Sequence, residues 1–212
     1  MEIWLDGYDL KLLEKIKELN LVHGVTTNPS IIARAGGSRA HILSTLLDFQ
    51  HGPLAVQIVA TNAEEIIEEA KALYGFSSRI IVKIPATMPG YQAIYRLSRA
   101  RIPTMATAIV DPLQALLAAK VGADYLALYL SSAGDNLLSV LPQIVKKENP
   151  VCKILGASIH KKEEISSLLE KLDGVTLSPA ILKEILETPL AAAQALAKFD
   201  YDVSIRACLK SF

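Results

Sequence analysis

The chain has little cysteine, no excess of either charge and no long apolar run, and each absence excludes a class of protein. Only two of its 212 residues are cysteines, Cys152 and Cys208, spaced for neither a disulfide framework nor a metal site. Basic and acidic residues number 22 each with no basic block, which argues against nucleic acid as a partner. No apolar run approaches the roughly 20 residues that span a bilayer, and "MEIWLDGYDL" is no secretory signal. We therefore expect a cytoplasmic protein with no membrane partner.

What the chain does have is an unbroken alternation of short β-rich runs and helical patterns. Half of the residues are apolar (51%) and 21% are charged, as in a globular protein. The strands are expected at 2–6, 23–28, 54–60, 79–85, 104–110, 124–130, 152–158 and 174–178. The helices are expected near 9–19, 38–49, 61–74, 90–100, 111–121, 135–147, 161–172, 178–186 and 189–198.

Eight consecutive strand–helix units indicate one α/β domain over residues 1–212. The strands are nearly continuous apolar runs, as expected for a parallel sheet that is covered on both faces. Their number favours a (β/α)8 TIM barrel with a C-terminal helical tail over about 199–212, and a doubly wound open sheet is the alternative. Neither GxGxxG nor GxxxxGK follows any strand, so the usual nucleotide-binding fingerprints are absent.

Polar residues recur where the predicted strands run into their following loops. In a TIM barrel those strand ends form the face that carries the chemistry. Seven of the eight strands have such a residue: Asp6, Asn28, Gln57, Lys83, Thr107, Tyr129 and Ser158. Seven polar side chains that converge on one face predict a polar pocket above an apolar core.

Lys83 is the most informative of these residues because it lies inside the apolar run "IIVKIP". Burial of an ammonium group is costly, and a protein usually responds by lowering the lysine pKa. The resulting neutral amine is a nucleophile that can form a Schiff base with a carbonyl substrate. The alternatives are a lysine that reaches solvent or one that pairs with a carboxylate.

Several of the other residues have purely structural interpretations. Asp6 or Asp9 could cap the first helix, Ser30 could cap the helix after "TTNP", and Ser158 could cap the one after its strand. Thr61 and Glu64 have capping-box spacing. His160 and Lys161 are either solvated or placed to bind a phosphate.

Two motifs carry a resemblance to a known family. "GVTTNPSII" (24–32) resembles the signature of the transaldolase family, and "IIVKIPAT" (80–87) resembles its Schiff-base lysine segment. The likeness continues through "TMATAIV", "DYLALYL" and "GASIH", over essentially the whole chain. It points to the short branch that includes fructose-6-phosphate aldolase. The resemblance implies a class I aldolase on a (β/α)8 barrel, with no cofactor and no metal, that acts in carbohydrate metabolism such as the pentose phosphate pathway.

The resemblance also implies residue roles. Lys83 corresponds to the nucleophile and Asp6 to the aspartate that assists proton transfer. Gln57, Thr107 and Tyr129 correspond to the group that holds the catalytic water, with Tyr129 as the proton donor and acceptor. The substrate-binding residues implied in this way are Asn28, Thr26, Ser158, Ser132 and His160.

Two positions separate the aldolase branch from transaldolases proper, and one departs from the branch. Gln57 stands where transaldolases have glutamate, and Tyr129 where they have phenylalanine. Ser132, however, replaces an arginine that holds the substrate phosphate in the branch, and serine cannot supply its charge. We therefore expect either weaker phosphate binding, through Ser158, His160 and Lys161, or an unphosphorylated substrate.

Three functions stay open at this point. The first is an aldolase with a dihydroxyacetone-type donor and a sugar or sugar-phosphate substrate. The second is a transaldolase that passes the three-carbon unit to an aldose phosphate, and the third is a barrel that only binds a sugar. The resemblance further implies a homo-oligomer, a pentamer or a decamer, in which the apolar tail packs on a neighbouring subunit.

Overall fold

The computed structural model describes residues 1–132 and 137–201, and its centre is a closed barrel of eight parallel strands in sequence order. The strands are β1 (Glu2–Asp6), β2 (Gly24–Thr26), β3 (Leu54–Gln57), β4 (Ile80–Pro85), β5 (Thr104–Ile109), β6 (Tyr125–Tyr129), β7 (Lys153–Ala157) and β8 (Gly174–Leu177). β8 pairs with β1 from Glu2 to Leu5, which closes the ring. The predicted TIM barrel is confirmed.

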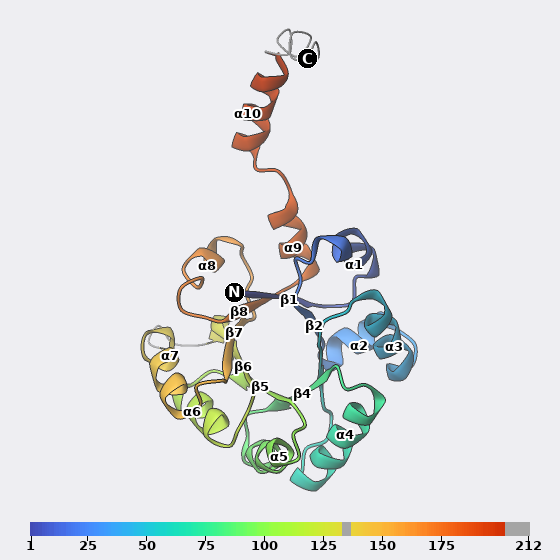
Figure 1. Cartoon of the computed structure of the whole chain (residues 1–212), viewed down its shortest axis with the longest axis vertical. Coiled ribbons are helices and arrows are strands. Elements are labelled where there is room, and N and C mark those ends of the chain that lie inside the picture. Colours follow the sequence, from blue (N-terminus) through green and yellow to red (C-terminus); the bar gives the residue numbers. More distant parts are fainter. Residues whose placement is uncertain (133–136, 202–212) are drawn as a thin grey trace, which may run out of the picture.

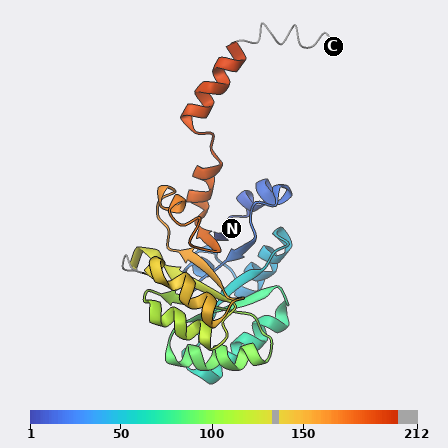
Figure 2. The same cartoon turned by 60° about the vertical axis from the view of Figure 1, so that its left-hand side comes forward.

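Helices surround the barrel, as Figure 1 shows in a view close to its axis. The α-helices are α1 (Leu10–Ile16), α2 (Pro29–Ala35), α3 (Arg39–Phe49), α4 (Ala63–Phe76), α5 (Met88–Arg99), α6 (Pro112–Lys120), α7 (Leu137–Glu148), α8 (Glu163–Ser166), α9 (Pro179–Leu186) and α10 (Leu190–Tyr201). Two 3-10 turns, η1 (Lys17–Leu19) and η2 (Leu130–Ser132), follow α1 and β6. α10 extends away from the barrel, most clearly in Figure 2.

The predicted helix starts are partly right. Asp111 and Ser178 cap α6 and α9, each followed by the proline that the sequence placed there. Asp9, rather than Asp6, caps α1. The capping box of Thr61 and Glu64 is wrong, because the side chain of Asn62 caps α4 by accepting from the Glu65 amide.

Other predicted helices differ in their bounds. The helix expected over 161–172 is wrong in length, because only Glu163–Ser166 is α-helical. No side chain caps α8, so Ser158 has no capping role there. The start predicted near Asp135 lies outside the described residues, as does the part of the predicted tail beyond Tyr201.

Strand alternation separates two apolar clusters. Residues that face outward, such as Val25, Val82 and Leu126, pack against the surrounding helices. Residues that face inward form a second cluster inside the barrel, consisting of Trp4, Ala55, Ile81, Met105, Ala127, Leu155 and Ala157. The interior is therefore a packed core rather than a channel, and it provides a floor below the carboxyl ends of the strands.

Candidate active site

The next inward-facing position on each strand, two residues further along, is where the polar side chains gather. Trp4 is followed in this way by Asp6, Ala55 by Gln57, Ile81 by Lys83, Met105 by Thr107 and Ala127 by Tyr129. For these five strands the predicted convergence follows from alternation, whereas Ser158 directly follows the inward-facing Ala157 and has a positive φ of 59°.

A cavity of about 340 Å³ opens above this layer, a size suited to a small ligand. Its lining residues are Asp6, Asn28, Lys83, Tyr129, Ala157, Ser158, Ile159, His160, Thr176, Ser178 and Ile181. The cavity brings together six residues that the sequence singled out, from β1, the N-cap of α2, β4, β6 and the loop after β7.

Lys83 lies at the base of the cavity and is 4% exposed. Burial lowers the pKa of Lys83 below its ordinary value, and the negative charge of Asp6 opposes that shift without overcoming it. Lys83 takes part in none of the ion pairs among residues 1–132 and 137–201. Neither structural alternative for this lysine, a solvent-exposed amine or a salt bridge, therefore applies.

Asp6 is oriented by a short hydrogen bond from its neighbour on β2. Thr26 Oγ1 donates to Asp6 Oδ1 at 2.6 Å, and Thr26 is fully buried. The two residues are also register partners across β1 and β2. Thr26 thus acts on the site by holding the carboxylate and does not line the cavity.

Asn28 lies two residues after the end of β2 and directly before α2. Its Oδ1 accepts a hydrogen bond from the Ile31 amide at 2.9 Å, which caps α2 and fixes the orientation of the side-chain amide. The expectation that Ser30 caps this helix is wrong, since Ser30 lies inside α2. No hydrogen bond of the Nδ2 donor of Asn28 is found within the part of the chain that the structure describes.

Gln57 and Thr107 lie on the two strands that flank Lys83. Gln57 is the register partner of Lys83, and Thr107 is the partner of Pro85. Gln57 Oε1 and Thr107 Oγ1 are buried and have no hydrogen-bond partner in the described part of the chain. Buried polar atoms are rarely left in this state, so each is suited to hold a water molecule or a substrate hydroxyl. Neither residue is among those that line the cavity.

Of the substrate-binding residues predicted after β6 and β7, Ser158 and His160 line the cavity and Ser132 does not. Ser131 Oγ and Ser158 Oγ lie 2.7 Å apart, and His160 Nε2 lies 3.5 Å from Ser158 Oγ. Ser158 has a φ of 59°, an unusual backbone conformation of the kind found at functional sites. Ser132 is exposed and does not line the cavity.

Sequence reasoning missed the contribution of β8. Thr176 and Ser178 line the cavity, together with Ile181 from the first turn of α9. The signal was available in "GVTLS", because alternation from Gly174 points positions 176 and 178 to the same side as Lys83. All eight strand ends, not seven, therefore supply polar groups.

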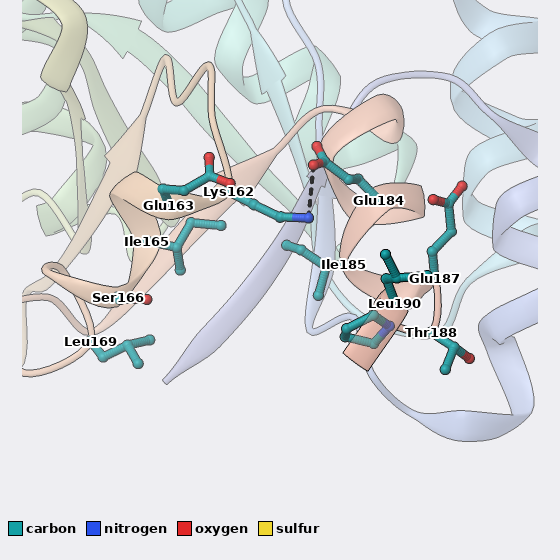
Figure 3. Close-up of a pocket in the computed structure, with 11 residues that line it drawn as sticks. Lys162, Glu163, Ile165, Ser166, Leu169, Glu184, Ile185, Glu187, Thr188 and Leu190 are labelled. Atoms are coloured by element: carbon teal, nitrogen blue, oxygen red, sulfur yellow. Dashed lines mark ion pairs between the residues drawn. The ribbon is translucent and has the colours of Figure 1, made fainter. Parts of the chain in front are cut away.

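A larger groove lies elsewhere and contains none of the predicted site residues. It has a volume of about 590 Å³ and lies between the α8 segment and the α9–α10 connection. Figure 3 shows the Lys162–Glu184 ion pair across it, with Ile185 and Leu169 nearby.

The described residues contain neither a membrane-spanning helix nor a cluster of metal ligands. No helix in 1–132 and 137–201 is long and apolar enough to cross a membrane. In the same residues, no group of three or more His, Cys, Asp or Glu side chains is arranged to hold a metal ion.

Comparison with known proteins decides the family. The profile described as Transaldolase/Fructose-6-phosphate aldolase matches residues 3–210. The chain belongs to this family. It is 33% identical to a probable transaldolase of Chlorobium phaeobacteroides over 97% of both chains. It is 34% identical to one of Thermoplasma volcanium over 89% of both. A third, of Maridesulfovibrio salexigens, is 33% identical over 95% of this chain and 97% of its own.

Membership of the transaldolase/fructose-6-phosphate aldolase family confirms the resemblance found in the sequence. It supports an enzyme of the transaldolase type that acts through a lysine Schiff base. The family name covers both a lyase and a transferase, and these differ in what happens to the enzyme-bound three-carbon unit.

Proposed function

We propose that this chain is a class I aldolase that cleaves or forms a C–C bond of a ketose through a Schiff base on Lys83. The observation that carries the proposal is the burial of Lys83 in a polar cavity without a counter-ion pair, which lowers its pKa. A neutral amine at the base of a cavity of this size is the nucleophile that imine chemistry requires.

The reaction begins with attack of Lys83 Nζ on the ketone carbon. The resulting carbinolamine loses water to give an iminium ion, and Asp6 transfers the protons in this step. Thr26 holds the Asp6 carboxylate in place through the 2.6 Å hydrogen bond. Asn28 Nδ2 donates to a substrate hydroxyl, which fixes the substrate relative to the iminium carbon.

Bond cleavage then needs a base at the hydroxyl of the departing aldehyde. A water held by Gln57 Oε1 and Thr107 Oγ1, together with Tyr129, removes that proton. The electrons of the broken C–C bond move to the iminium group and form an enamine. Protonation of the enamine carbon and hydrolysis release a dihydroxyacetone-type ketone and free Lys83, which balances the cycle.

A transaldolase is the second candidate, and the names of the relatives favour it. Such an enzyme would pass the enamine to an aldose-phosphate acceptor before it could be protonated. Gln57 and Tyr129 favour the lyase instead, because they match the aldolase branch at both positions that separate the two.

Product analysis separates the two candidates. Fructose 6-phosphate and unphosphorylated fructose are each incubated with the protein, with and without erythrose 4-phosphate. Release of free dihydroxyacetone without an acceptor supports the aldolase. Turnover that requires the acceptor, with no free dihydroxyacetone, contradicts it and supports the transferase. Lys83→Met is the inactive control, and Lys71→Met, on the outer surface of α4, is the matched active control.

The same proposal includes a homo-oligomer in the cytoplasm, a pentamer or decamer as the resemblance implies. Every described side chain of α10 from Leu190 to Ala197 is exposed, including Leu190 at 74% and Leu196 at 55%. An apolar helix that its own barrel leaves uncovered is suited to pack on a neighbouring subunit. Light scattering of the purified protein gives the number of subunits, and a monomer would contradict this part of the proposal.

A further inference from the structure

A second hollow adjoins the catalytic cavity and contains an arginine with an unoccupied guanidinium fork. Its volume is about 520 Å³, and its lining is Asp6, Gly7, Tyr8, Asn28, Ile31, Arg34, Ala35, Ser178 and Pro179. Asp6, Asn28 and Ser178 also line the catalytic cavity. The two hollows therefore meet at the catalytic carboxylate, and a substrate bound at Lys83 can extend from one into the other.

Arg34 is well placed to hold an anion there. It lies on α2, whose first residue follows the Asn28 cap, so β2, Asn28 and Arg34 belong to one continuous unit. Arg34 Nε donates to the Ser30 carbonyl at 3.2 Å, which leaves Nη1 and Nη2 unbound. No carboxylate in the described part of the chain forms an ion pair with it.

The catalytic cavity itself offers a phosphate little charge. No arginine is among its described lining residues, and Lys83 must be neutral to attack a carbonyl. Ser158 and His160 supply hydroxyl and imidazole groups over β7, with Ser131 beside Ser158, and Ser132 is not among the lining residues. Arg34 is the one arginine among the described residues that line the two joined hollows.

We propose that Arg34 is the specificity-determining residue that binds the phosphate monoester of the substrate, in the hollow on the α2 side of Asp6. The two terminal nitrogens of Arg34 match two phosphate oxygens in a bidentate contact. The hydroxyls of Tyr8 and Ser178 line the same hollow and are further donors to the ester. The inference rests on the proposed aldolase function and deepens it, since it names a phosphorylated sugar as the substrate and the side of the barrel where its phosphate lies.

The kinetic test compares a phosphorylated and an unphosphorylated substrate in Arg34→Ala and Arg34→Lys. We expect the ratio of kcat/KM for fructose 6-phosphate to that for fructose to fall by about 10- to 100-fold in Arg34→Ala, mostly through KM, because a charge-assisted contact is lost. Arg34→Lys should fall between, since lysine keeps the charge without the fork.

Arg99→Ala is the matched control. Arg99 is also an exposed arginine in the last turn of a helix, α5, and it lines neither hollow. If the Arg34→Ala and Arg99→Ala ratios change alike, Arg34 serves only its helix terminus and the proposal is wrong.

A binding measurement keeps this test separate from that of the aldolase function. In a Lys83→Met background no imine can form, and calorimetry reports the affinity for fructose 6-phosphate directly. We expect the added Arg34→Ala change to weaken that affinity by about 10-fold or more. If binding depends on Arg34 but the protein with its native Lys83 forms no adduct, the aldolase function alone is overturned. Adduct formation with binding that is independent of Arg34 would overturn this inference alone.

Discussion

At the scale of single residues, the burial that makes the Lys83 amine reactive also makes the folded protein less stable. The protein folds around an amine that burial disfavours in its charged form, so the pKa of Lys83 lies below its value in the unfolded chain. The unfolded state therefore binds more protons between the two pKa values. Stability should rise as the pH rises from the folded-state pKa toward the ordinary lysine pKa of 10.5.

Replacement of Lys83 by methionine tests both consequences. We expect turnover to fall by about 10³-fold or more because the nucleophile is gone. We also expect Lys83→Met to be more stable than the native protein at pH 7, because no charge has to be buried or neutralised. The gain should shrink toward pH 10.5, where the unfolded chain begins to lose the lysine proton that the folded protein has already lost.

Denaturant midpoints of the two proteins at pH 7 and pH 10 provide the measurement. Lys71→Met, an exposed position on α4, controls for the general loss of a lysine. A Lys83→Met variant that is less stable than the native protein at pH 7 would show that Lys83 has a stabilising partner.

Tyr129 provides a second prediction at this scale. Tyr129→Phe keeps the ring and removes the hydroxyl that we assign to proton transfer. We expect kcat for ketose cleavage to fall by about 10²-fold, with borohydride-trapped adduct still formed on Lys83. Loss of the adduct in Tyr129→Phe would instead place Tyr129 in imine formation.

The residue scale also shows what the sequence predicts well. Lys83, Asp6 and Tyr129 follow from one rule, a polar residue at the end of an apolar strand. Ser131 and Arg34 do not, because the contact of Ser131 with Ser158 and the place of Arg34 in its hollow depend on the path of η2 and α2 after the strands. Asn28 was predicted as a substrate ligand, but its capping role follows only from the start of α2 at Pro29.

At the scale of elements, the loop after β3 is held by an ion-pair network beside Gln57. Arg39 of α3 forms an ion pair with Glu69 of α4 at 2.6 Å, and its Nη2 donates to the Gln57 carbonyl at 2.9 Å. Glu69 Oε2 also accepts from the amides of Val59 and Ala60. The network therefore fixes the carboxyl end of β3 from outside the barrel.

Opposing effects set the pKa of Glu69. Burial would raise this pKa, but the Ala60 and Val59 amides and the Arg39 guanidinium together hold it below its ordinary value. A carboxylate of this kind stabilises the fold above its unfolded-state pKa, and that stability is lost as the pH falls through the lower folded-state pKa.

Removal of the carboxylate should loosen the β3 end. We expect Glu69→Ala to lower the free energy of unfolding by about 1–2 kcal/mol, because two amides and a guanidinium lose their acceptor. Activity should fall through kcat as Gln57 shifts. Chemical denaturation and steady-state kinetics check the two effects, with Glu68→Ala, the exposed neighbour, as the control. Equal stability of the two variants would contradict the role of this network.

Element bounds mark the limit of sequence-based prediction. Residues 161–172 have a helical pattern, yet only Glu163–Ser166 is α-helical, and β8 begins at Gly174. Asn62 and Thr61 are both good caps, and the choice between them depends on how α4 meets the barrel. Tertiary packing decides such local alternatives.

At the scale of the whole molecule, the closed barrel follows from repetition and α10 does not. Eight strand–helix units of similar length leave few arrangements other than a ring, so the barrel could be predicted without a template. The direction of α10 away from its own barrel has no signature in the sequence, since its apolar residues fit a folded-back helix equally well (Figure 2).

Disruption of the exposed face of α10 tests its role in assembly. We expect Leu196→Glu to shift the protein to smaller species, because a charge at an apolar subunit contact is costly. The barrel should keep its circular dichroism spectrum, since Leu196 is 55% exposed in the single chain. Light scattering measures the change, and an unaltered oligomer would mean that α10 contacts no neighbouring subunit through this side chain.

Borohydride trapping addresses the chemistry of the whole protein most directly. The protein is reduced in the presence of fructose 6-phosphate, fructose or dihydroxyacetone, and its intact mass and labelled peptide are determined. A three-carbon adduct on Lys83, absent from Lys83→Met, is the expected result. An adduct on another lysine, or none with any of the three ketoses, would contradict the Schiff-base function proposed for Lys83.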